Sequence, residues 1–404
     1  MERLISVTKA ENIVLRAARQ VGAGFKPVST DLSKAYGSVL AENIFADRDQ
    51  PSTDRSSMDG IAISYSAWQK GIRTFRVSGM QRAGISQKTL RQKSHCWEVM
   101  TGAVIPKGAD CIVPIEAVDL MKGKAFIKAG AKISRFQFIR KQGSEYRKGT
   151  LLLKKHTELK AAQIAVAGSV GKNKIKIFSP HIAVIGTGDE LVEINKSVKP
   201  YQSRRSNAYA LAALLKLNGF SRVGRFHFND NARELRNGLK KILNGHDVVI
   251  LSGGVSMGKF DFIPQVLKKL GVKVLFYKVS QKPGKPFWFG LTKKHQPVFA
   301  LPGNPVSTQV CAYRYALPYL KKASGLKSDS QFAILGRDIP AHSSFTLFVP
   351  VNLKQNFATQ ILAVPVSFAG SGDYAALTKA DGFIELPARS RKFQKGEMAR
   401  LFQW

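Results

Sequence analysis

The sequence predicts a multidomain protein of α/β and β structure, built around a central parallel α/β sheet. Its 404 residues exceed the length of an ordinary single domain, so two to four domains are expected. Residues 179–327 alternate strand-like and helix-like segments, a pattern typical of a parallel sheet with helices on both faces. Residues 328–404 show strand-like runs, which predict a small C-terminal β-barrel or sandwich.

The segments before the sheet are predicted to form two further domains. Residues 1–26 carry apolar side chains near helical spacing, which predicts a helix. Residues 27–146 hold short strand-like runs broken by Gly, Pro and Ser, and this pattern predicts an irregular β-rich domain. Residues 147–178 return to strand, helix and strand, and we expect them to join the N-terminal helix in one discontinuous linking domain.

The strand predicted at Val248–Ser252 runs directly into two glycines, Gly253 and Gly254, and a helical pattern begins after Asp261. Such a turn leaves backbone N–H groups free, and these groups form a site for an anion, most often phosphate. A carboxylate beside an anion makes chemical sense when a divalent cation lies there too, so Asp261 is a candidate metal ligand. A tight strand-to-helix turn without a ligand is the alternative explanation.

Three more predicted strands end in polar loops. The segment His181–Glu190 ends in a Gly-rich loop with carboxylates, and Val298–Pro305 ends in a Pro-stiffened loop. The turn Gln281–Pro286 follows the predicted strand Val272–Tyr277 and carries two lysines three residues apart. Ligands of an open parallel sheet bind outside the carboxyl ends of its strands, so we expect all four loops to meet in one place.

The net charge of +36 is the most unusual property of the composition. Nucleic-acid binding would explain such a charge, but the lysines are spread along the whole chain and no basic run is interleaved with aromatic residues. We therefore interpret most of the charge as a basic solvated surface and part of it as attraction for an anionic substrate. Specific nucleic-acid binding is not expected.

The sequence also bears on location. No apolar run approaches the roughly 18 residues of a membrane span, and the N-terminus lacks the apolar core of a signal peptide. The three cysteines, Cys96, Cys111 and Cys311, lie far apart and show neither zinc-site spacing nor a disulfide framework. A cytoplasmic location without a membrane partner is therefore expected.

Six segments form a recognisable set along the chain. They are Arg55–Gly60, Thr101–Asp110, Gly186–Leu191, Ser252–Gly258, Lys282–Pro286 and Leu301–Ser307. The set resembles the motifs of the molybdopterin molybdenumtransferases, the MoeA and gephyrin E-domain family, in the family's order and up to about Gly382. One such motif is weak evidence for a family, but six in order are strong evidence.

The resemblance implies a four-domain chain that forms an elongated homodimer. It also implies that the protein takes adenylylated molybdopterin, hydrolyses the adenylate with release of AMP, and inserts molybdenum from molybdate between the two sulfurs. Mg²⁺ is the implied cofactor, and a molybdopterin adenylyltransferase is an implied partner. This reaction needs cations for the phosphates, a divalent metal for the pyrophosphate bond and a small positive pocket for the oxyanion.

Four carboxylates are the predicted catalytic residues: Asp59, Glu190, Asp230 and Asp261. Of these, Glu190, Asp230 and Asp261 are the candidate Mg²⁺ ligands, because Mg²⁺ prefers oxygen ligands and takes one or two protein carboxylates. Simpler roles stay open as alternatives. Asp230 is also the predicted N-cap of a helix, Glu190 is a candidate for pairing with a lysine, and Asp59 precedes a glycine as in an Asp-Gly turn.

Three lysines, Lys278, Lys282 and Lys285, supply the predicted positive groups for the anionic pterin, and ordinary surface lysine is the alternative. The other predicted substrate-binding residues come from the loops described above and from the resemblance: Thr101, Gly102, Arg140, Gly253, Gly254, Ser256, Pro302, Asn304, Pro305 and Ser371. The loop at Ser371 matches a family Ser-Gly loop that reaches the cleft from the partner chain.

Three positions depart from the family pattern. Glu145 replaces an aspartate, Arg205 replaces an aspartate before Ser206, and Leu347 replaces an arginine of the C-terminal domain. The central carboxylates and lysines remain, so an active transferase is predicted. The alternatives are a non-catalytic scaffold of the same family and a nucleic-acid-binding protein.

Overall fold

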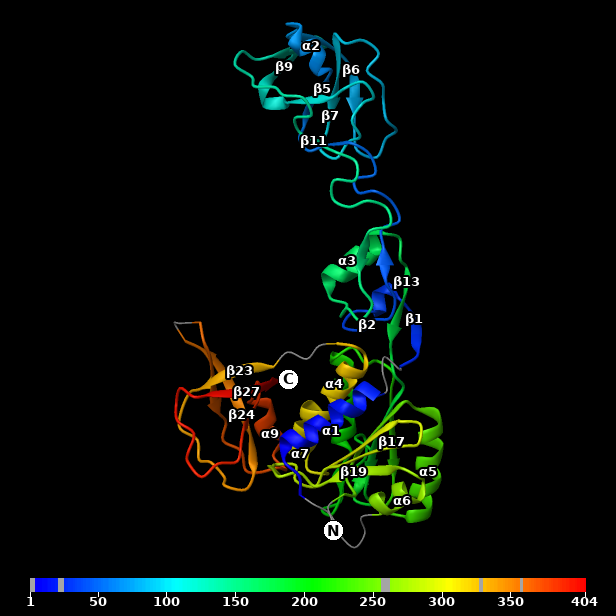
Figure 1. Cartoon of the computed structure of the whole chain (residues 1–404), viewed down its shortest axis with the longest axis vertical. Coiled ribbons are helices and arrows are strands. Elements are labelled where there is room, and N and C mark those ends of the chain that lie inside the picture. The colour runs from blue at the N-terminus through cyan, green and yellow to red at the C-terminus, as the bar shows by residue number, and fades with distance from the viewer. Residues whose placement is uncertain (1–3, 21–24, 256–261, 327–329, 357–358) are drawn as a thin grey trace. The chain divides into compact units, whose positions relative to one another are not determined.

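The structure is a computed structural model that describes residues 4–20, 25–255, 262–326, 330–356 and 359–404 (Figure 1). The chain divides into two compact units, which we call the smaller and the larger unit. The smaller unit comprises residues 43–154 and 165–172, and the larger unit comprises residues 1–42, 155–164 and 173–404. The division into four domains stays a prediction.

The smaller unit is β-rich, as predicted. Its main sheet has the strand order β8-β5-β7-β6-β10-β9, and all four residues of β5, Gly60–Ile63, are buried. Frequent Gly and Pro residues keep the strands short, because each breaks the run after a few positions. The other bounds are β3 Ile44–Phe45, β4 Arg55–Ser56, α2 Tyr65–Gln69, β6 Thr74–Gln81, β7 His95–Val99, β8 Cys111–Pro114, β9 Val118–Met121, β10 Lys124–Ile127, β11 Ile139–Arg140 and β12 Leu151–Leu153.

The larger unit contains the predicted central sheet, with the strand order β17-β14-β18-β22-β21-β19. Strands β17, β14, β18 and β22 are parallel neighbours. Strand β21 is antiparallel to both of its neighbours, so β19 at the edge again runs in the direction of β22. The bounds are β14 Ile182–Thr187, β17 Val223–Phe228, β18 Val248–Ser252, β19 Lys273–Tyr277, β21 Trp288–Leu291 and β22 Pro297–Leu301.

The predicted parallel sheet also contains one antiparallel strand, β21, which was not predicted. Strands β19 and β21 form an antiparallel pair on either side of the predicted Pro-Gly turn. A short connection suffices for an antiparallel pair, whereas parallel strands need a crossover of about a dozen residues or more. The apolar run at residues 287–291 is the sequence signal of this extra strand. The carboxyl ends of β14, β18, β22 and β19 nevertheless point to the same edge.

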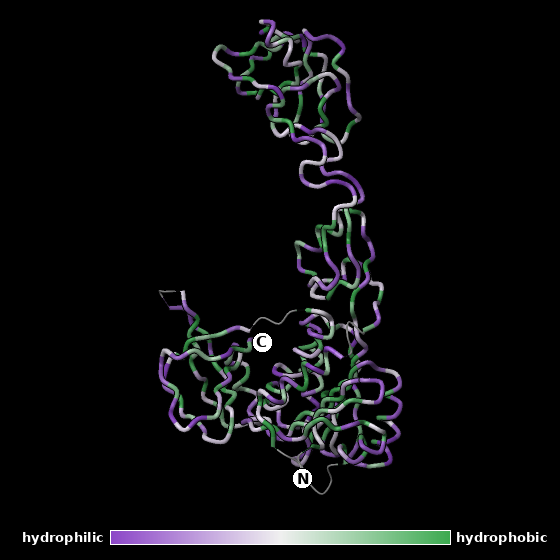
Figure 2. The backbone as a smooth tube through the Cα atoms, in the orientation of Figure 1, coloured by the Kyte–Doolittle hydropathy of each residue, from purple (hydrophilic) through white to green (hydrophobic). Residues whose placement is uncertain are grey.

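Helices cover the central sheet, and its strand residues alternate between two cores. Val184 and Ile250 lie in one core, whereas their neighbours Ile185 and Leu251 lie in the other. Both faces of these strands are therefore buried, which explains their nearly continuous apolar sequences (Figure 2). The helices of this region are α1 Val7–Gln20, α4 Ser206–Leu217, α5 Ala232–Gly245, α6 Ile263–Lys269, α7 Pro305–Cys311, the π-helical turn η3 Ala312–Ala316 and α8 Leu317–Ala323.

Helix α5 begins one residue later than predicted. Asn231 is its N-cap, and the side-chain oxygen of Asn231 accepts hydrogen bonds from the backbone N–H groups of Arg233 and Glu234. The prediction that Asp230 caps this helix is therefore wrong. The backbone N–H of Asp230 instead donates a hydrogen bond to Asp189 Oδ1 (3.0 Å).

The C-terminal part of the larger unit is a closed barrel, which decides between the two predicted forms. Its strands follow the order β24-β25-β23-β27-β26, and β26 pairs with β24 to close the ring. Strand β20, Gln281–Lys282, also pairs with β24. The short helix α9 interrupts the predicted run of strands. The bounds are β23 Gln331–Leu335, β24 Thr346–Gln355, β25 Ile361–Pro365, α9 Tyr374–Thr378, β26 Gly382–Leu386 and β27 Met398–Gln403.

The remaining elements are short. A small antiparallel sheet of the larger unit has the order β1-β13-β2. The bounds are β1 Pro27–Asp31, β2 Val39–Leu40, α3 Ala161–Ser169, β13 Lys174–Phe178, β15 Leu191–Val192 and β16 Ser203–Arg204. Within the described residues, no helix combines the length and the apolar character that a membrane crossing requires.

Candidate functional site

The carboxyl ends of β14, β18 and β22 lie at one edge of the central sheet, where a ligand site was predicted. A cavity of about 590 Å³, which we call the first cavity, opens at this edge. Predicted site residues from the loops after all three strands line it: Glu190, Gly253, Asn304 and Pro305. The structure therefore brings these loops together as expected.

The backbone requires the two glycines after β18. Gly253 and Gly254 have φ angles of +103° and +67°, and a Cβ atom at Gly253 would lie 2.7 Å from the carbonyl oxygen of Thr187. This close approach leaves no room for a side chain beside the first cavity. Two predicted residues of the same loop, Ser256 and Asp261, lie outside the described residues.

Asn207, at the start of α4, ties the loops around the first cavity together. Its Nδ2 donates hydrogen bonds to the carbonyl oxygen of Gly303 (2.7 Å) and to Ser252 Oγ (3.0 Å). The hydroxyl of Tyr374 donates to Asn207 Oδ1 (3.0 Å). Neither Asn207 nor Tyr374 was predicted as a site residue. The Ser206-Asn207 pair of the family pattern is the signal that identifies Asn207, whereas Tyr374 has no such signal.

Glu190 and Asp230 are the two predicted metal ligands that the structure describes. Glu190 is exposed and lines the first cavity, and its carboxylate has no hydrogen-bond or ion-pair partner within the described parts of the chain. The alternative of a Glu190–lysine pair is therefore not found there. Asp230 is half-buried and does not line this cavity. No group of three or more His, Cys, Asp or Glu side chains forms a metal cluster among the described residues.

The segment Lys282–Pro283–Gly284–Lys285, which we call the lysine turn, borders a second cavity of about 750 Å³. Residues of the lysine turn, of the loop after β22 and of the barrel line this cavity. Lys282 and Lys285 are exposed, and neither ammonium group has a carboxylate within ion-pair distance among the described residues. Their positive charge therefore remains available for an anionic ligand.

Lys278 lines neither of these cavities, although it directly follows β19. It has a φ angle of +72°, a left-handed conformation that costs a non-glycine residue roughly 1–2 kcal/mol. Its Nζ lies 5.5 Å from the centre of the Tyr277 ring. The structure thus places two of the three predicted lysines at the second cavity, and not the third.

Asn304 lines both cavities and connects them. Its Nδ2 donates a hydrogen bond to Ser371 Oγ (2.7 Å), and the backbone N–H of Val306 donates to the carbonyl oxygen of Ser371 (3.0 Å). Pro302 and Ser371 also line the second cavity. These hydrogen bonds join residues of one chain, and the expectation that the Ser371 loop reaches the cleft of a partner chain stays a prediction.

Asp59, Thr101 and Gly102 form another group, in the smaller unit. The backbone N–H and the hydroxyl of Thr101 donate to Asp59 Oδ1 at 2.6 and 2.8 Å. Arg55 Nη1 donates to the carbonyl oxygen of Gly102 (3.0 Å). The two hydrogen bonds from Thr101 hold the pKa of Asp59 below its ordinary value, and the bond from the backbone N–H has the larger effect. Asp59 is thus a carboxylate that is stabilised in its charged form.

The three departures from the family pattern have different structural outcomes. Glu145 forms an ion pair with Arg140, so this predicted substrate-binding arginine is already engaged. Arg205 lines the first cavity and pairs with Glu193 (2.8 Å), which offsets the added positive charge. Leu347 gives the second cavity an apolar side chain where the family pattern has an arginine.

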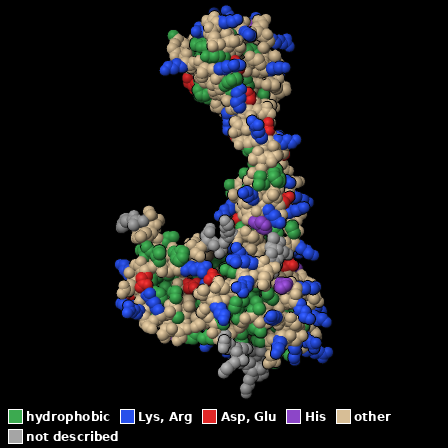
Figure 3. Space-filling view, viewed as in Figure 1, with side chains coloured by type: hydrophobic (Ala, Val, Ile, Leu, Met, Phe, Trp, Pro, Cys, Tyr) green, Lys and Arg blue, Asp and Glu red, His purple; other side chains and the backbone are tan. Residues whose placement is uncertain are grey.

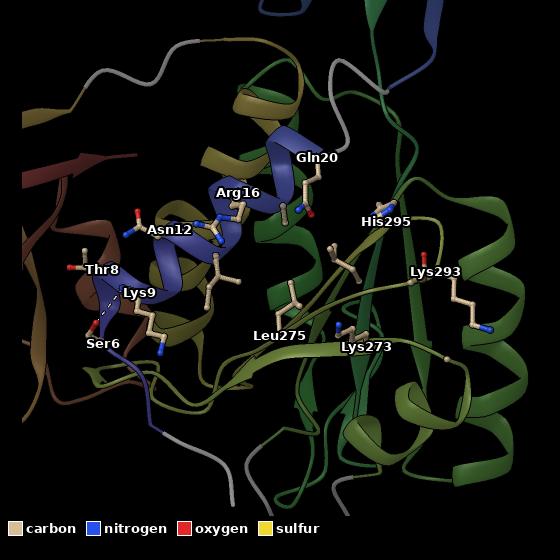
Figure 4. Close-up of a pocket in the computed structure, with 15 residues that line it drawn as sticks. Ser6, Thr8, Lys9, Asn12, Arg16, Gln20, Lys273, Leu275, Lys293 and His295 are labelled. Atoms are coloured by element: carbon tan, nitrogen blue, oxygen red, sulfur yellow. Dashed lines mark hydrogen bonds between the residues drawn. The ribbon is translucent and has the colours of Figure 1, made fainter.

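Basic side chains are dispersed over the surface, and some line a third cavity. Figure 3 shows Lys and Arg side chains scattered over the visible face. The third cavity, of about 860 Å³, lies between α1 and the β19–β21 pair (Figure 4). Its basic lining residues are Lys9, Arg16, Lys273, Lys293 and His295. Of the predicted site residues that the structure describes, none lines this cavity, so the basic character of the chain extends beyond the predicted site.

Three known protein-family domains match consecutive parts of the chain. The MoeA N-terminal region (domain I and II) matches residues 5–171, and the probable molybdopterin binding domain matches residues 183–322. The MoeA C-terminal region (domain IV) matches residues 333–404. The three matches together span nearly the whole chain.

Individual proteins resemble the chain over the same extent. A molybdopterin molybdenumtransferase from Synechocystis sp. is 36% identical over 403 residues and covers 99% of this chain and 100% of its own. A protein of the same name from Staphylococcus epidermidis is 31% identical, with 98% and 94% covered. A crystal structure of a molybdopterin biosynthesis MoeA protein from Pyrococcus horikoshii has a TM-score of 0.81, 29% identity and 99% coverage of both chains. The chain therefore belongs to the MoeA family of molybdopterin molybdenumtransferases.

Proposed function

We propose that this protein is a molybdopterin molybdenumtransferase of molybdenum cofactor biosynthesis. It takes adenylylated molybdopterin and molybdate, breaks the pyrophosphate bond with release of AMP, and leaves molybdenum bound to the two dithiolene sulfurs. Family membership over the whole chain supports this proposal. The lysine turn, which lines the second cavity, also supports it.

One observation carries the proposal: two cavities share Asn304 in their linings, and together they present groups that suit an anionic substrate and its metal ion. The first cavity presents the Glu190 carboxylate beside Gly253, whose N–H donates to the carbonyl oxygen of Leu301 (3.1 Å). The second cavity presents the two lysines of the lysine turn, which have no carboxylate partner among the described residues. An adenylylated pterin carries several phosphate charges, and molybdate is a dianion. The ammonium groups of the lysine turn suit these anions.

Mg²⁺ is the proposed metal cofactor, and Glu190 is the described residue that suits it best. Its carboxylate is exposed, lines the first cavity and has no partner among the described residues. One or two protein carboxylates are enough, because Mg²⁺ usually keeps several waters. Asp230 and Asp261 remain the further candidates by family resemblance. When bound, Mg²⁺ neutralises phosphate charge at the bond that breaks.

The proposal extends to assembly and location. Family membership supports a homodimer and a molybdopterin adenylyltransferase that supplies the substrate. The cytoplasm is the proposed location, supported by Cys96, Cys111 and Cys311, which are buried free thiols. A nucleic-acid ligand is not proposed, because the family matches do not favour it and the basic residues are dispersed.

The direct test is to incubate the purified protein with adenylylated molybdopterin, Mg²⁺ and molybdate, and to assay AMP and molybdenum cofactor. Both products should form together, and omission of Mg²⁺ should stop AMP release. Molybdopterin without the adenylyl group is the control substrate and should yield no AMP. Binding of the adenylylated pterin without AMP release would overturn the proposal and favour a non-catalytic scaffold.

A further inference from the structure

The lysine turn has a buried backbone and exposed charges. Pro283 and Gly284 are buried, whereas the side chains of Lys282 and Lys285 on either side are exposed and line the second cavity. Neither lysine side chain donates a hydrogen bond to a described residue, although the Lys285 ammonium lies 5.3 Å from the centre of the Phe345 ring. The positions from which the two side chains extend are therefore set by what holds the backbone of the turn.

The amide of Gln281 fills the inside of the lysine turn. Gln281 is 1% exposed, and its Nε2 donates to the carbonyl oxygens of Pro283 (3.3 Å) and Gly284 (3.1 Å). The same nitrogen also donates to Cys311 Sγ (3.4 Å). A Cβ atom at Gly284 would lie 2.6 Å from this nitrogen, so glycine is needed for the amide to fit. One buried side chain thus fixes both carbonyl groups between the two lysines.

Tyr315 fixes the orientation of that amide. Its hydroxyl donates a hydrogen bond to Gln281 Oε1 (2.5 Å), and its ring packs against Phe287 with centroids 4.8 Å apart. Tyr315 is 1% exposed, and burial raises its pKa well above the ordinary value, so the hydroxyl keeps its proton. The donor requires the Gln281 oxygen to face Tyr315, and the amide nitrogen must then face the lysine turn.

We propose that Gln281 and Tyr315 are positioning residues for the transferase reaction, holding Lys282 and Lys285 in the spacing that the anionic substrate requires. The proposal rests on the proposed function, since it assumes that the two lysines bind the substrate. Neither Gln281 nor Tyr315 carries a charge, and although Gln281 borders the second cavity, its amide points to the lysine turn and to Tyr315. They act by holding the backbone of the lysine turn, so their loss should weaken substrate binding.

Tyr315→Phe is the main test variant, because it removes the hydroxyl and keeps the ring. We expect KM for adenylylated molybdopterin to rise about 10-fold, as for one lost hydrogen bond to a positioned group, while kcat changes less than about 3-fold. Hydrogen exchange over residues 279–287 should become faster. Tyr319→Phe is the matched control, since Tyr319 is also fully buried and its hydroxyl has no partner among the described residues. It should leave both measurements unchanged.

A second arm separates this proposal from the proposed function. When Lys282→Ala and Lys285→Ala are combined, adding Tyr315→Phe should not weaken substrate binding further, because the groups that it positions are gone. Suppose that the lysine variants bind the substrate weakly, but Tyr315→Phe has the same KM and exchange rates as Tyr319→Phe. This result would contradict the positioning role and leave the proposed function intact. If the lysine variants instead bind adenylylated molybdopterin as tightly as the wild type, Lys282 and Lys285 do not bind the substrate, and that part of the proposed function is overturned. If Tyr315→Phe does not fold, Gln281→Met, which removes the amide without burying a charge, tests the same hydrogen-bond unit from its other member.

Discussion

Individual positive charges of the chain differ in how available they are to an anion. Lys282 and Lys285 have no carboxylate partner among the described residues, whereas Arg140 and Arg205 are each engaged in an ion pair. An unpaired ammonium group keeps its full attraction for an anion, whereas a paired guanidinium shares its charge with the carboxylate that holds it. We therefore expect the two lysines to contribute more to substrate binding than the two arginines.

Lys282→Ala should raise KM for adenylylated molybdopterin on the order of 10- to 100-fold, the loss expected for one hydrogen bond to a charged group. Steady-state AMP release measures this change. Lys240→Ala is the control, because Lys240 is an exposed lysine on α5 far along the chain from the lysine turn. Equal KM values for the two variants would contradict the assignment of Lys282 to the substrate site.

Thr101→Val should raise the pKa of Asp59, because the variant loses the hydroxyl that donates to this carboxylate. A carboxylate with a lowered pKa in the folded state contributes stability above its ordinary pKa, and that contribution is lost as pH falls through the folded value. The variant should therefore show a weaker dependence of stability on acid pH. Carbon-detected NMR titration of Asp59 measures the shift, and Thr101→Ser, which keeps the hydroxyl, should titrate like the wild type.

Individual elements were predictable where the local signal was strong. The strand Val248–Ser252 matches its prediction, because a buried apolar run ends at two glycines that need positive φ angles. Strand β21 was not predicted, because a short apolar run alone shows neither that it forms a strand nor in which direction the strand runs. The Gln281–Tyr315 hydrogen bond joins positions 34 residues apart, and no local pattern indicates it. Fold class and motif loops therefore followed from the sequence, whereas strand direction and side-chain pairing needed the tertiary structure.

Asn231→Ala should destabilise the larger unit by about 1 kcal/mol, because the side chain of Asn231 satisfies two backbone N–H groups at the start of α5. Urea unfolding measures the loss. Asn237→Ala is the matched control, since Asn237 is exposed in the middle of the same helix, where alanine favours the helix. A loss of similar size for both variants would contradict the capping role of Asn231.

Across the whole molecule, the feature that joins the most distant segments is a buried ion-pair network in the larger unit. Arg314, 1% exposed, pairs with Glu11 of α1 and Glu385 of β26, both at 2.7 Å. Arg400 of β27 also pairs with Glu11 (2.9 Å). Burial raises the pKa of Glu11, but the hydrogen bonds and charges of Arg314 and Arg400 outweigh it, so this pKa lies below its ordinary value.

Arg314→Met should destabilise the larger unit by about 3–5 kcal/mol, because it leaves the Glu11 and Glu385 carboxylates without their buried partner. Thermal unfolding measures the loss. The difference from the wild type should shrink as pH falls through the lowered pKa of Glu11, since the pair stabilises only while Glu11 is charged. Arg389→Met removes a more exposed pair with Glu397 and should have a small effect. Equal losses for both variants would contradict a special role for the buried network.

The central claim is that the lysine turn and the neighbouring strand ends form the site for the anionic pterin. Lysine footprinting of the intact protein tests this claim most directly, with amine acylation read by mass spectrometry in the presence and absence of adenylylated molybdopterin. We predict that the substrate protects Lys282 and Lys285 from acylation and leaves Lys240 as reactive as before. Protection that is uniform over the lysines, or that falls at the third cavity on Lys9 and Lys273 instead, would contradict the claim.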